Sequence, residues 1–282
     1  MNKIAIFTDS IADLSEDVKA AHHIISIPHY INFDTEIYQD GVNFIAEDLY
    51  KLVKEKKNFP KTTAATHEDF IFLFESYLNF GYDILYIGVG SKFSLAYQNA
   101  LMTKEQVNPS RIYIVDSQNL SSGIGILVLK AIKMRDQRVS IGVIQQRLTQ
   151  LVPRIKTQFV LKTNEYMIKD KLISPLMGLI GRIFKVKPLI HVENGELKLY
   201  KKSFGSLKKA IRVMLQELFE SIIYLDTEYV LVTHSLANRE VLFMISQIKK
   251  HLPNVQIVES NAGCVMSMHC GPGAVGLTYI TI

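Results

Sequence analysis

In the first half of the chain, short runs of apolar residues alternate with segments whose apolar residues recur at helical spacing. The apolar runs lie at 3–8, 83–89 and 111–115, and helical spacing follows at 95–107 and 121–135. A continuous apolar run of this length is typical of a strand buried on both faces. Because strand, loop and helix recur in this order, the pattern predicts an α/β domain built on a parallel, doubly wound sheet.

From about residue 157 the pattern changes to strand-like segments separated by only two helices. Helical spacing extends over about 206–222 and 237–249, and Asn194-Gly195 predicts a hairpin turn. We therefore expect a second, α+β domain with a mostly antiparallel sheet, and we divide the chain into residues 1–160 and 161–282. The expected strands of this second half lie at 157–162, 186–192, 196–201, 228–234, 254–259 and 276–282.

Three polar loops follow the apolar strands of the first domain, at 8–10, 88–94 and 116–122. Ligands of doubly wound sheets bind where the parallel strands end, so these loops are expected to surround a site. Asp9 and Asp116 abut two of these strand ends, where helix capping explains them. The sequence therefore predicts a ligand site at the carboxyl edge of the parallel sheet.

A hydroxyl-rich loop, Pro60-Lys61-Thr62-Thr63-Ala64-Ala65-Thr66, lies between two amphipathic helices. Hydroxyls and backbone N–H groups can hold an anion, but they do not readily exchange protons near pH 7. Thr62 and Thr63 are either turn residues or ligand-binding residues, whereas Thr66 is more simply the cap of the following helix. The loop therefore fits a holder of an anion better than a catalyst.

Two further side chains are candidates for the same site. Ser94 precedes a predicted helix, where it either caps the helix or helps the helix N-terminus to hold an anion. His269 precedes Gly271-Pro272-Gly273-Ala274-Val275-Gly276, and a structural or a functional histidine fits this position equally well. These glycines are not a dinucleotide fingerprint, because the six residues that follow leave no room for the required helix, and we expect a tight turn instead.

Charge and composition argue against several classes of protein. The net charge is +5, but the basic residues are scattered without interleaved aromatics, which argues against a nucleic-acid groove. The two cysteines and the histidines lack the spacing of metal ligands, so we expect no metal, no cofactor and a reduced, cytoplasmic protein. We also expect no signal peptide and no membrane-spanning segment, because no run of 18 apolar residues occurs.

Six short motifs stand in order along nearly the whole chain. They are Thr8-Asp9-Ser10, Tyr38-Gln39-Asp40-Gly41, Pro60-Lys61-Thr62-Thr63-Ala64-Ala65-Thr66, Phe93-Ser94-Leu95-Ala96-Tyr97, Val115-Asp116-Ser117 and His269-Cys270-Gly271-Pro272-Gly273. In this order and at this spacing, they resemble the motifs of the DegV family, whose members include the acyl-binding subunits of bacterial fatty acid kinase. The chain departs from the family at Thr63-Ala64-Ala65 and Leu95-Ala96, which replace Ser-Gln-Pro and Gly-Thr.

The resemblance implies a Rossmann-like domain and a second α/β domain with a long-chain fatty acid, such as palmitate, bound between them. It assigns the carboxylate of the acid to Thr62 and Ser94, with His269 nearby. Thr63, Gly271 and Gly273 follow as second-rank candidates. It also implies a binding protein rather than an enzyme, one that presents its acid to the catalytic subunit of a fatty acid kinase.

The apolar tail of such an acid would need an apolar lining. The candidates come from a predicted helix over 172–184, although ordinary core packing explains the same residues equally well. An alternative function is a nucleotide- or phosphate-dependent enzyme that uses the strand-end loops of the first domain. The candidate lining residues are Ile173, Leu176, Ile180 and Phe184.

Overall fold

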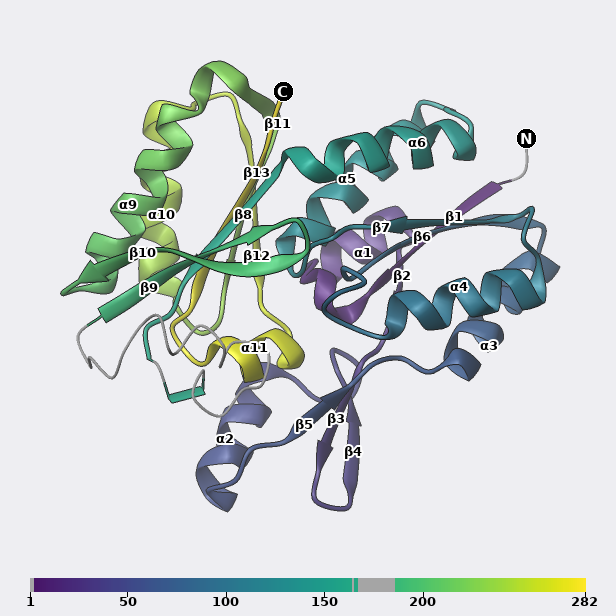
Figure 1. The fold of residues 1–282 in the computed structure, drawn as a ribbon, viewed down its shortest axis with the longest axis horizontal. Helices are drawn as coiled ribbons and strands as arrows, with labels where there is room; N and C mark the ends of the chain where they lie inside the picture. The colour runs from purple at the N-terminus through teal and green to yellow at the C-terminus, as the bar shows by residue number, and fades with distance from the viewer. Residues whose placement is uncertain (1–2, 164, 167–185) are drawn as a thin grey trace.

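The computed structural model describes residues 3–163, 165–166 and 186–282. Its first sheet is parallel, with the order β2-β1-β6-β7, and it confirms the predicted doubly wound domain. Helices α3 and α4 cover one face of this sheet, and α5 and α6 cover the other (Figure 1). The strands are β1 (Lys3–Asp9), β2 (Ile25–Ile27), β6 (Tyr82–Gly88) and β7 (Ile112–Asp116). The helical segments are η1 (Ser10–Ala12), α1 (Glu16–His22), α3 (His67–Asn79), α4 (Ala96–Val107), α5 (Ser122–Asp136), α6 (Ile141–Leu151) and η2 (Val152–Arg154).

A small antiparallel sheet extends from the first domain, with the order β4-β3-β5. Its strands are β3 (Tyr30–Phe33), β4 (Glu36–Gln39) and β5 (Lys61–Thr63), and helix α2 (Ala46–Lys56) lies beside it (Figure 1). The segment 60–66, expected to be a loop throughout, therefore contains a short strand. Backbone pairing of Thr62 with Ile31 supplies the order that a free loop would lack.

The second sheet has six strands in the order β10-β9-β8-β13-β11-β12, and all its pairs are antiparallel except β11–β12. This confirms the predicted, mostly antiparallel sheet. Strand β8 belongs to it by pairing, and the division at residue 160 stays a prediction. The strands are β8 (Ile155–Val160), β9 (Val186–Glu193), β10 (Glu196–Phe204), β11 (Leu225–His234), β12 (Gln256–Asn261) and β13 (Val275–Thr281). The helical segments are α9 (Leu207–Glu220), η4 (Ile222–Tyr224), α10 (Asn238–His251) and α11 (Cys264–Cys270).

Helix α5 joins the two sheets, because it contacts β1 and β6 on one side and β8, β11 and β13 on the other. Its sequence is apolar around most of its circumference, as expected for a helix buried on several sides. Gly125 lets α5 lie close to η1, since a Cβ at this position would be 3.0 Å from the carbonyl oxygen of Ala12. The two sheets therefore share one continuous packing layer.

Helices α9 and α10 lie together against the second sheet, and α11 lies between this sheet and α2 (Figure 1). The apolar face of α9, which includes Ala210, Met214 and Leu218, is buried against the strands. Within the described ranges, no helix is both long and apolar enough to cross a membrane.

Candidate functional site

A cavity of about 580 Å³ lies where the two domains meet, and four of the predicted site residues line it. Thr62 and Thr63 come from β5, Ser94 from the loop before α4, and His269 from α11. The structure thus brings together side chains that lie up to about two hundred residues apart in the sequence. The apolar part of the lining consists of Ile11, Ala64, Val89, Phe93, Leu95, Leu120, Val265 and Met266.

The threonine wall of the cavity is held by β5. Thr62 pairs with Ile31 and Thr63 with Tyr30 across the small sheet. The hydroxyl of Thr63 accepts a hydrogen bond from Asn32 Nδ2 at 3.0 Å. Thr66 caps α3 as predicted, because its hydroxyl accepts a hydrogen bond from the backbone N–H of Asp69 at 3.3 Å.

The serine wall is positioned by the loop between β6 and α4. Asp116 accepts hydrogen bonds from both the backbone N–H and the hydroxyl of Ser91, at 3.0 and 2.7 Å. The backbone N–H of Gly90 donates to the carbonyl oxygen of Asn119 at 2.8 Å. Ser94 Oγ accepts a hydrogen bond from the N–H of Ala96 at 3.2 Å, at the first turn of α4. Ser94 therefore supports the helix start while it faces the cavity, so its two candidate roles are compatible.

Asp9 does not cap a helix through its side chain, contrary to the expectation from its place after β1. Its carboxylate instead accepts hydrogen bonds from Tyr86 Oη at 2.8 Å and from the N–H of Val89 at 2.6 Å. Burial beside Asp9 raises the pKa of the Tyr86 hydroxyl, which stays protonated and keeps donating. Asp9 thus fixes the end of β6, from which the Ser94 loop begins.

His29 is a cavity residue that the sequence reasoning missed. It is only 2% exposed, and its Nε2 lies 3.4 Å from Asp9 Oδ1 without a hydrogen-bond partner among the described residues. No motif surrounds it, since it belongs to none of the six family segments.

Two buried carboxyl groups anchor helix α11, which carries His269. Asp13 accepts a hydrogen bond from the N–H of Gly263 at 2.8 Å, and Asp40 accepts one from the N–H of Cys264 at 2.7 Å. Burial raises the pKa of Asp13 to about 8, and burial with the nearby Asp40 charge raises the pKa of the Cys264 thiol. These contacts tie α11 to the first domain and fix one wall of the cavity.

Gly271 and Gly273 form the expected tight turn, with φ angles of +74° and +84° that favour glycine. They do not line the cavity. A Cβ on Gly271 would lie 2.8 Å from the ring of Tyr166, so the glycine allows the backbone to pass this ring. Packing therefore explains the two glycines, and their role as second-rank ligand residues stays a prediction.

The four residues proposed to line an apolar tail, Ile173, Leu176, Ile180 and Phe184, lie outside the described residues. In the part of the chain that is described, no group of three or more His, Cys, Asp or Glu side chains could hold a metal ion. The cavity offers hydroxyl groups and imidazoles beside apolar side chains. Such a wall can hold a polar head and an apolar body of one ligand at the same time.

Comparison with known proteins places the chain in a family. The sequence model of the DegV family matches residues 3–281. A DegV domain-containing protein of Caldanaerobacter subterraneus is 35% identical over 280 residues, which cover 99% of both chains. A protein of Thermotoga maritima named fatty acid-binding protein is 28% identical over 97% of this chain and 96% of its own.

A solved structure from Thermotoga maritima has the same fold. It superposes with a TM-score of 0.87 at 26% identity over the full length of both chains, and it is described as revealing a fatty acid binding function. The match of the family model over nearly the whole length, together with a relative above 30% identity, is sufficient to assign the family. The chain belongs to the DegV family.

Proposed function

We propose that this protein binds a long-chain fatty acid, such as palmitate, in the cavity between its domains. Thr62 and Ser94 hold the carboxylate, His269 lies beside it, and the apolar tail occupies the apolar part of the cavity. The observation that carries the proposal is the meeting of these three polar side chains with apolar side chains at one cavity of about 580 Å³. This volume falls within the range of about 300–1,000 Å³ that ligand pockets have.

The apolar lining and the hydroxyl groups of this cavity suit the two parts of a fatty acid, its tail and its carboxylate. Each buried methylene contributes about 0.8 kcal/mol, so retention comes mostly from the tail. The head group then needs only to be positioned. Neutral hydroxyls hold a carboxylate through hydrogen bonds and leave an oxygen approachable, whereas a buried arginine would hold it more rigidly in a bidentate pair.

A sequence match and a structural match support the ligand class. The Thermotoga maritima protein that is 28% identical is named for fatty acid binding, and the superposable structure at 26% identity is described as revealing the same function. Because both matches cover nearly the whole chain, the domains that would enclose the acid have counterparts throughout. We infer that this chain is likewise a binding protein that carries its ligand and does not transform it.

A carrier implies a recipient for the bound acid. The family resemblance supports the catalytic subunit of a fatty acid kinase in that role, with the carboxylate as the group presented. Hydroxyl side chains at the head of the cavity suit this role, since they leave the carboxylate its own reactivity.

The test is fatty acid binding by the double variant Thr62→Ala/Ser94→Ala, measured by titration calorimetry with delipidated protein. The loss of two hydrogen bonds to a charged group is expected to weaken binding by about 1–3 kcal/mol. The matched control is Thr149→Ala/Ser246→Ala, because both residues are exposed, lie on helices of different domains and donate only to backbone carbonyl groups of their own helices.

The control variant should bind the acid as the unaltered protein does. Equal affinity in all three proteins would show that the carboxylate lies elsewhere in the molecule. Absence of fatty acid binding by the unaltered protein would reject the function itself, so the two failures are distinguishable.

A further inference from the structure

A second cavity, of about 320 Å³, lies in the second domain with a different lining. Its walls come from β8, β9, β10 and α9, and the loop residues Gln118 and Asn119 border it from the first domain. It shares no lining residue with the cavity that holds Thr62 and Ser94. The two cavities therefore have different linings, and the proposed fatty acid site leaves this one unexplained.

Three buried polar atoms of this cavity have no hydrogen-bond partner among the described residues. They are Gln158 Oε1 on β8, His191 Nε2 on β9 and Glu217 Oε2 on α9. Gln158 is 1% exposed and His191 9% exposed. Six side chains in the described part of the chain bury such an atom, and half of them gather here. Buried polar atoms are nearly always paired in native proteins, so this concentration needs a physical explanation.

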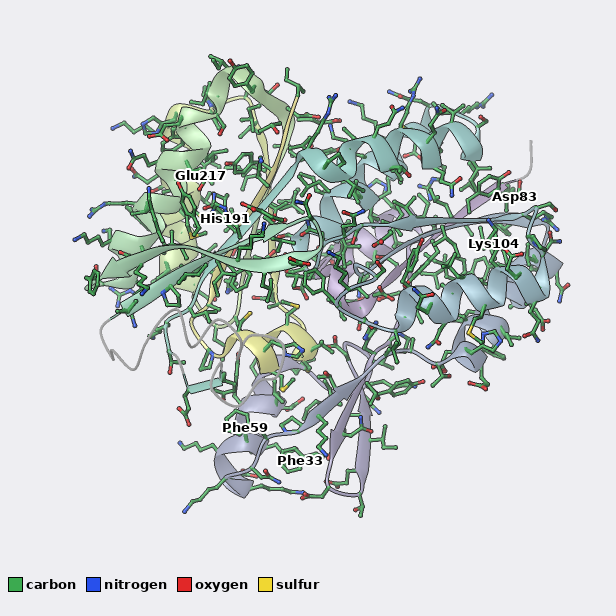
Figure 2. All side chains as sticks on the ribbon, viewed as in Figure 1. Phe33, Phe59, Asp83, Lys104, His191 and Glu217 are labelled. Carbon is green, nitrogen blue, oxygen red and sulfur yellow. The ribbon has the colours of Figure 1, made fainter. Side chains whose placement is uncertain are left out.

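The contact between His191 and Glu217 does not provide that explanation. Figure 2 shows the two side chains next to each other, from β9 and α9, and the facing atoms His191 Nε2 and Glu217 Oε2 are 3.2 Å apart. The contact is an ion pair when His191 is protonated, but the alignment of the two groups does not make a hydrogen bond. Both atoms therefore keep their bonding capacity for a third group.

Neighbouring contacts hold these side chains in place. The His191 ring stacks on Tyr200, with centroids 4.1 Å apart and an angle of 18° between the planes. Gln158 donates its Nε2 to the carbonyl oxygen of Met214 at 3.4 Å, which identifies Oε1 as the end without a partner. Gln158 and His191 are also direct register partners in the sheet. The unpartnered atoms thus form a preorganised set.

The hydrogen-bonding character of these three atoms indicates which class of ligand fits the cavity. The Gln158 amide oxygen and the Glu217 carboxylate oxygen can only accept hydrogen bonds, and His191 Nε2 accepts when the proton is on Nδ1. The other charged side chains of the lining are Lys156 and Glu193, and Glu193 is paired with Lys198 at 3.0 Å. The inner part of the cavity therefore presents three atoms that can accept hydrogen bonds, and Glu217 forms no ion pair with a lysine or arginine among the described residues.

We propose that this cavity is a second ligand site, which binds a small primary amine through its ammonium group. An ammonium group has three N–H donors, which match Gln158 Oε1, His191 Nε2 and Glu217 Oε2, and its charge complements the carboxylate. The remainder of the amine lies toward Tyr200 and the amide side chains of Gln118 and Asn119. The site is independent of the fatty acid site and does not rest on it.

The experiment is titration calorimetry of the fatty-acid-loaded protein with 4-aminobutan-1-ol, and in parallel with butane-1,4-diol. The two probes have the same length and differ in one ammonium group. We expect the amine to bind and the diol to bind at least about tenfold more weakly, since a charge-assisted hydrogen bond is lost. Absence of binding by the amine would mean that water or a His191–Glu217 bond satisfies these atoms, and equal binding of the diol would mean a polyol site. Either result overturns the proposal.

The variant Glu217→Gln tests the same site from the protein side. It keeps the size of the side chain and removes the charge, so amine affinity should fall at least about tenfold. Glu220→Gln is the matched control on the same helix, because Glu220 is exposed and outside the cavity. An unchanged affinity in Glu217→Gln, or an equal loss in Glu220→Gln, contradicts the assignment.

A measurement on the unaltered protein keeps the test valid should Glu217→Gln fail to fold. Nuclear Overhauser effects between the methylene protons of 4-aminobutan-1-ol and the ring protons of His191 and Tyr200 are expected. Contacts of the bound amine to other parts of the protein, without these two rings, would overturn the proposed site.

Discussion

The two cavities of this protein differ in the chemistry of their walls. The cavity between the domains combines hydroxyl and imidazole side chains, Thr62, Ser94 and His269 among them, with a set of apolar side chains. The cavity of the second domain is lined mostly by polar groups, three of which bury an unpartnered atom. The first suits a ligand with a long apolar body and a small polar head. The second suits a small ligand that is polar throughout.

The carboxyl groups at the two cavities also differ in their hydrogen-bond partners. Asp13, behind the wall of the first cavity, has both oxygens engaged, by the N–H of Gly263 and the hydroxyl of Ser121. Glu217, in the wall of the second cavity, leaves its Oε2 without a partner. A fully engaged carboxyl group stabilises structure, whereas one with free bonding capacity is available to a ligand. This contrast distinguishes framework groups from binding groups in the same molecule.

The largest expected effect comes from a charge placed in the apolar wall of the first cavity. Phe93→Asp replaces a half-buried aromatic side chain beside Ser94 with a carboxylate that faces the apolar tail and repels the carboxylate of the acid. Burial of an unpaired charge costs several kcal/mol, so fatty acid affinity should fall by about 3 kcal/mol or more. Titration calorimetry with palmitate measures the change.

Phe72→Asp is the matched control, because Phe72 is 74% exposed on α3 and does not line the cavity. It should retain the affinity of the unaltered protein. Binding of the amine in the second cavity should be the same in both variants. Retained palmitate affinity in Phe93→Asp would place the ligand away from this wall. The apolar lining of the first cavity would then not distinguish its ligand from that of the second.

A pH-dependent effect of intermediate size is expected at Asp13. Since burial raises the pKa of Asp13 from 3.8 to about 8, the folded protein holds a proton that the unfolded chain has lost between these values. Stability contributed by the neutral carboxyl group is therefore lost as the pH rises from about 4 to 8. Asp13→Asn removes this loss, and its free energy of unfolding should increase relative to the unaltered protein by about 1 kcal/mol per pH unit.

Urea unfolding at pH 5, 6, 7 and 8 checks this expectation. Asp17→Asn, an exposed change of the same kind on α1, should show no such trend with pH. A constant difference between Asp13→Asn and the unaltered protein over this range would mean that Asp13 is ionised in the folded state. The contrast between framework and binding carboxyl groups would then need another basis.

The smallest effect is expected at a contact between the loop before Ser94 and the turn at Asn194, which lines the second cavity. Lys92, in the loop before Ser94, donates hydrogen bonds to the carbonyl oxygen of Asn194 at 3.1 Å and to Glu196 at 2.8 Å. Both side chains of the ion pair are more than half exposed, so the pair should contribute little. Lys92→Met should change palmitate and amine affinity by less than about twofold.

The control for this variant is Lys249→Met, at an exposed position of α10. The two variants should be indistinguishable in both titrations. If Lys92→Met, but not Lys249→Met, changed both palmitate and amine affinity by more than about tenfold, the two cavities would be coupled through this loop. The cavities could then no longer be treated as independent.

Much of the fold could be predicted because hydrophobic periodicity reports burial directly. The runs 3–8, 83–89 and 111–115 are buried strands of the parallel sheet, and α9 follows its apolar face. The strand at Lys61–Thr63 was missed because its order comes from pairing with β3, more than twenty-five residues away. A short segment without apolar alternation carries no local signal of such a partner.

The first site was accessible from the sequence because its polar residues lie in motifs at strand ends. His29 was missed because it stands outside every motif and reaches the cavity only through the fold. Gln158, His191 and Glu217 were missed for the same reason, since they come from three elements with no shared spacing. Conversely, Gly271 and Gly273 were ranked with the ligand residues by their neighbourhood in sequence, while the structure places them against Tyr166 and Lys162.

The central claim is that the cavity between the domains holds a long-chain fatty acid. Native mass spectrometry of the full chain, purified from a bacterial host without added lipid, tests it most directly. We expect a protein mass increased by one bound acid of about 14–18 carbons, which is retained because each buried methylene contributes about 0.8 kcal/mol. A protein mass without ligand, together with no binding when palmitate is titrated into the protein, would contradict it.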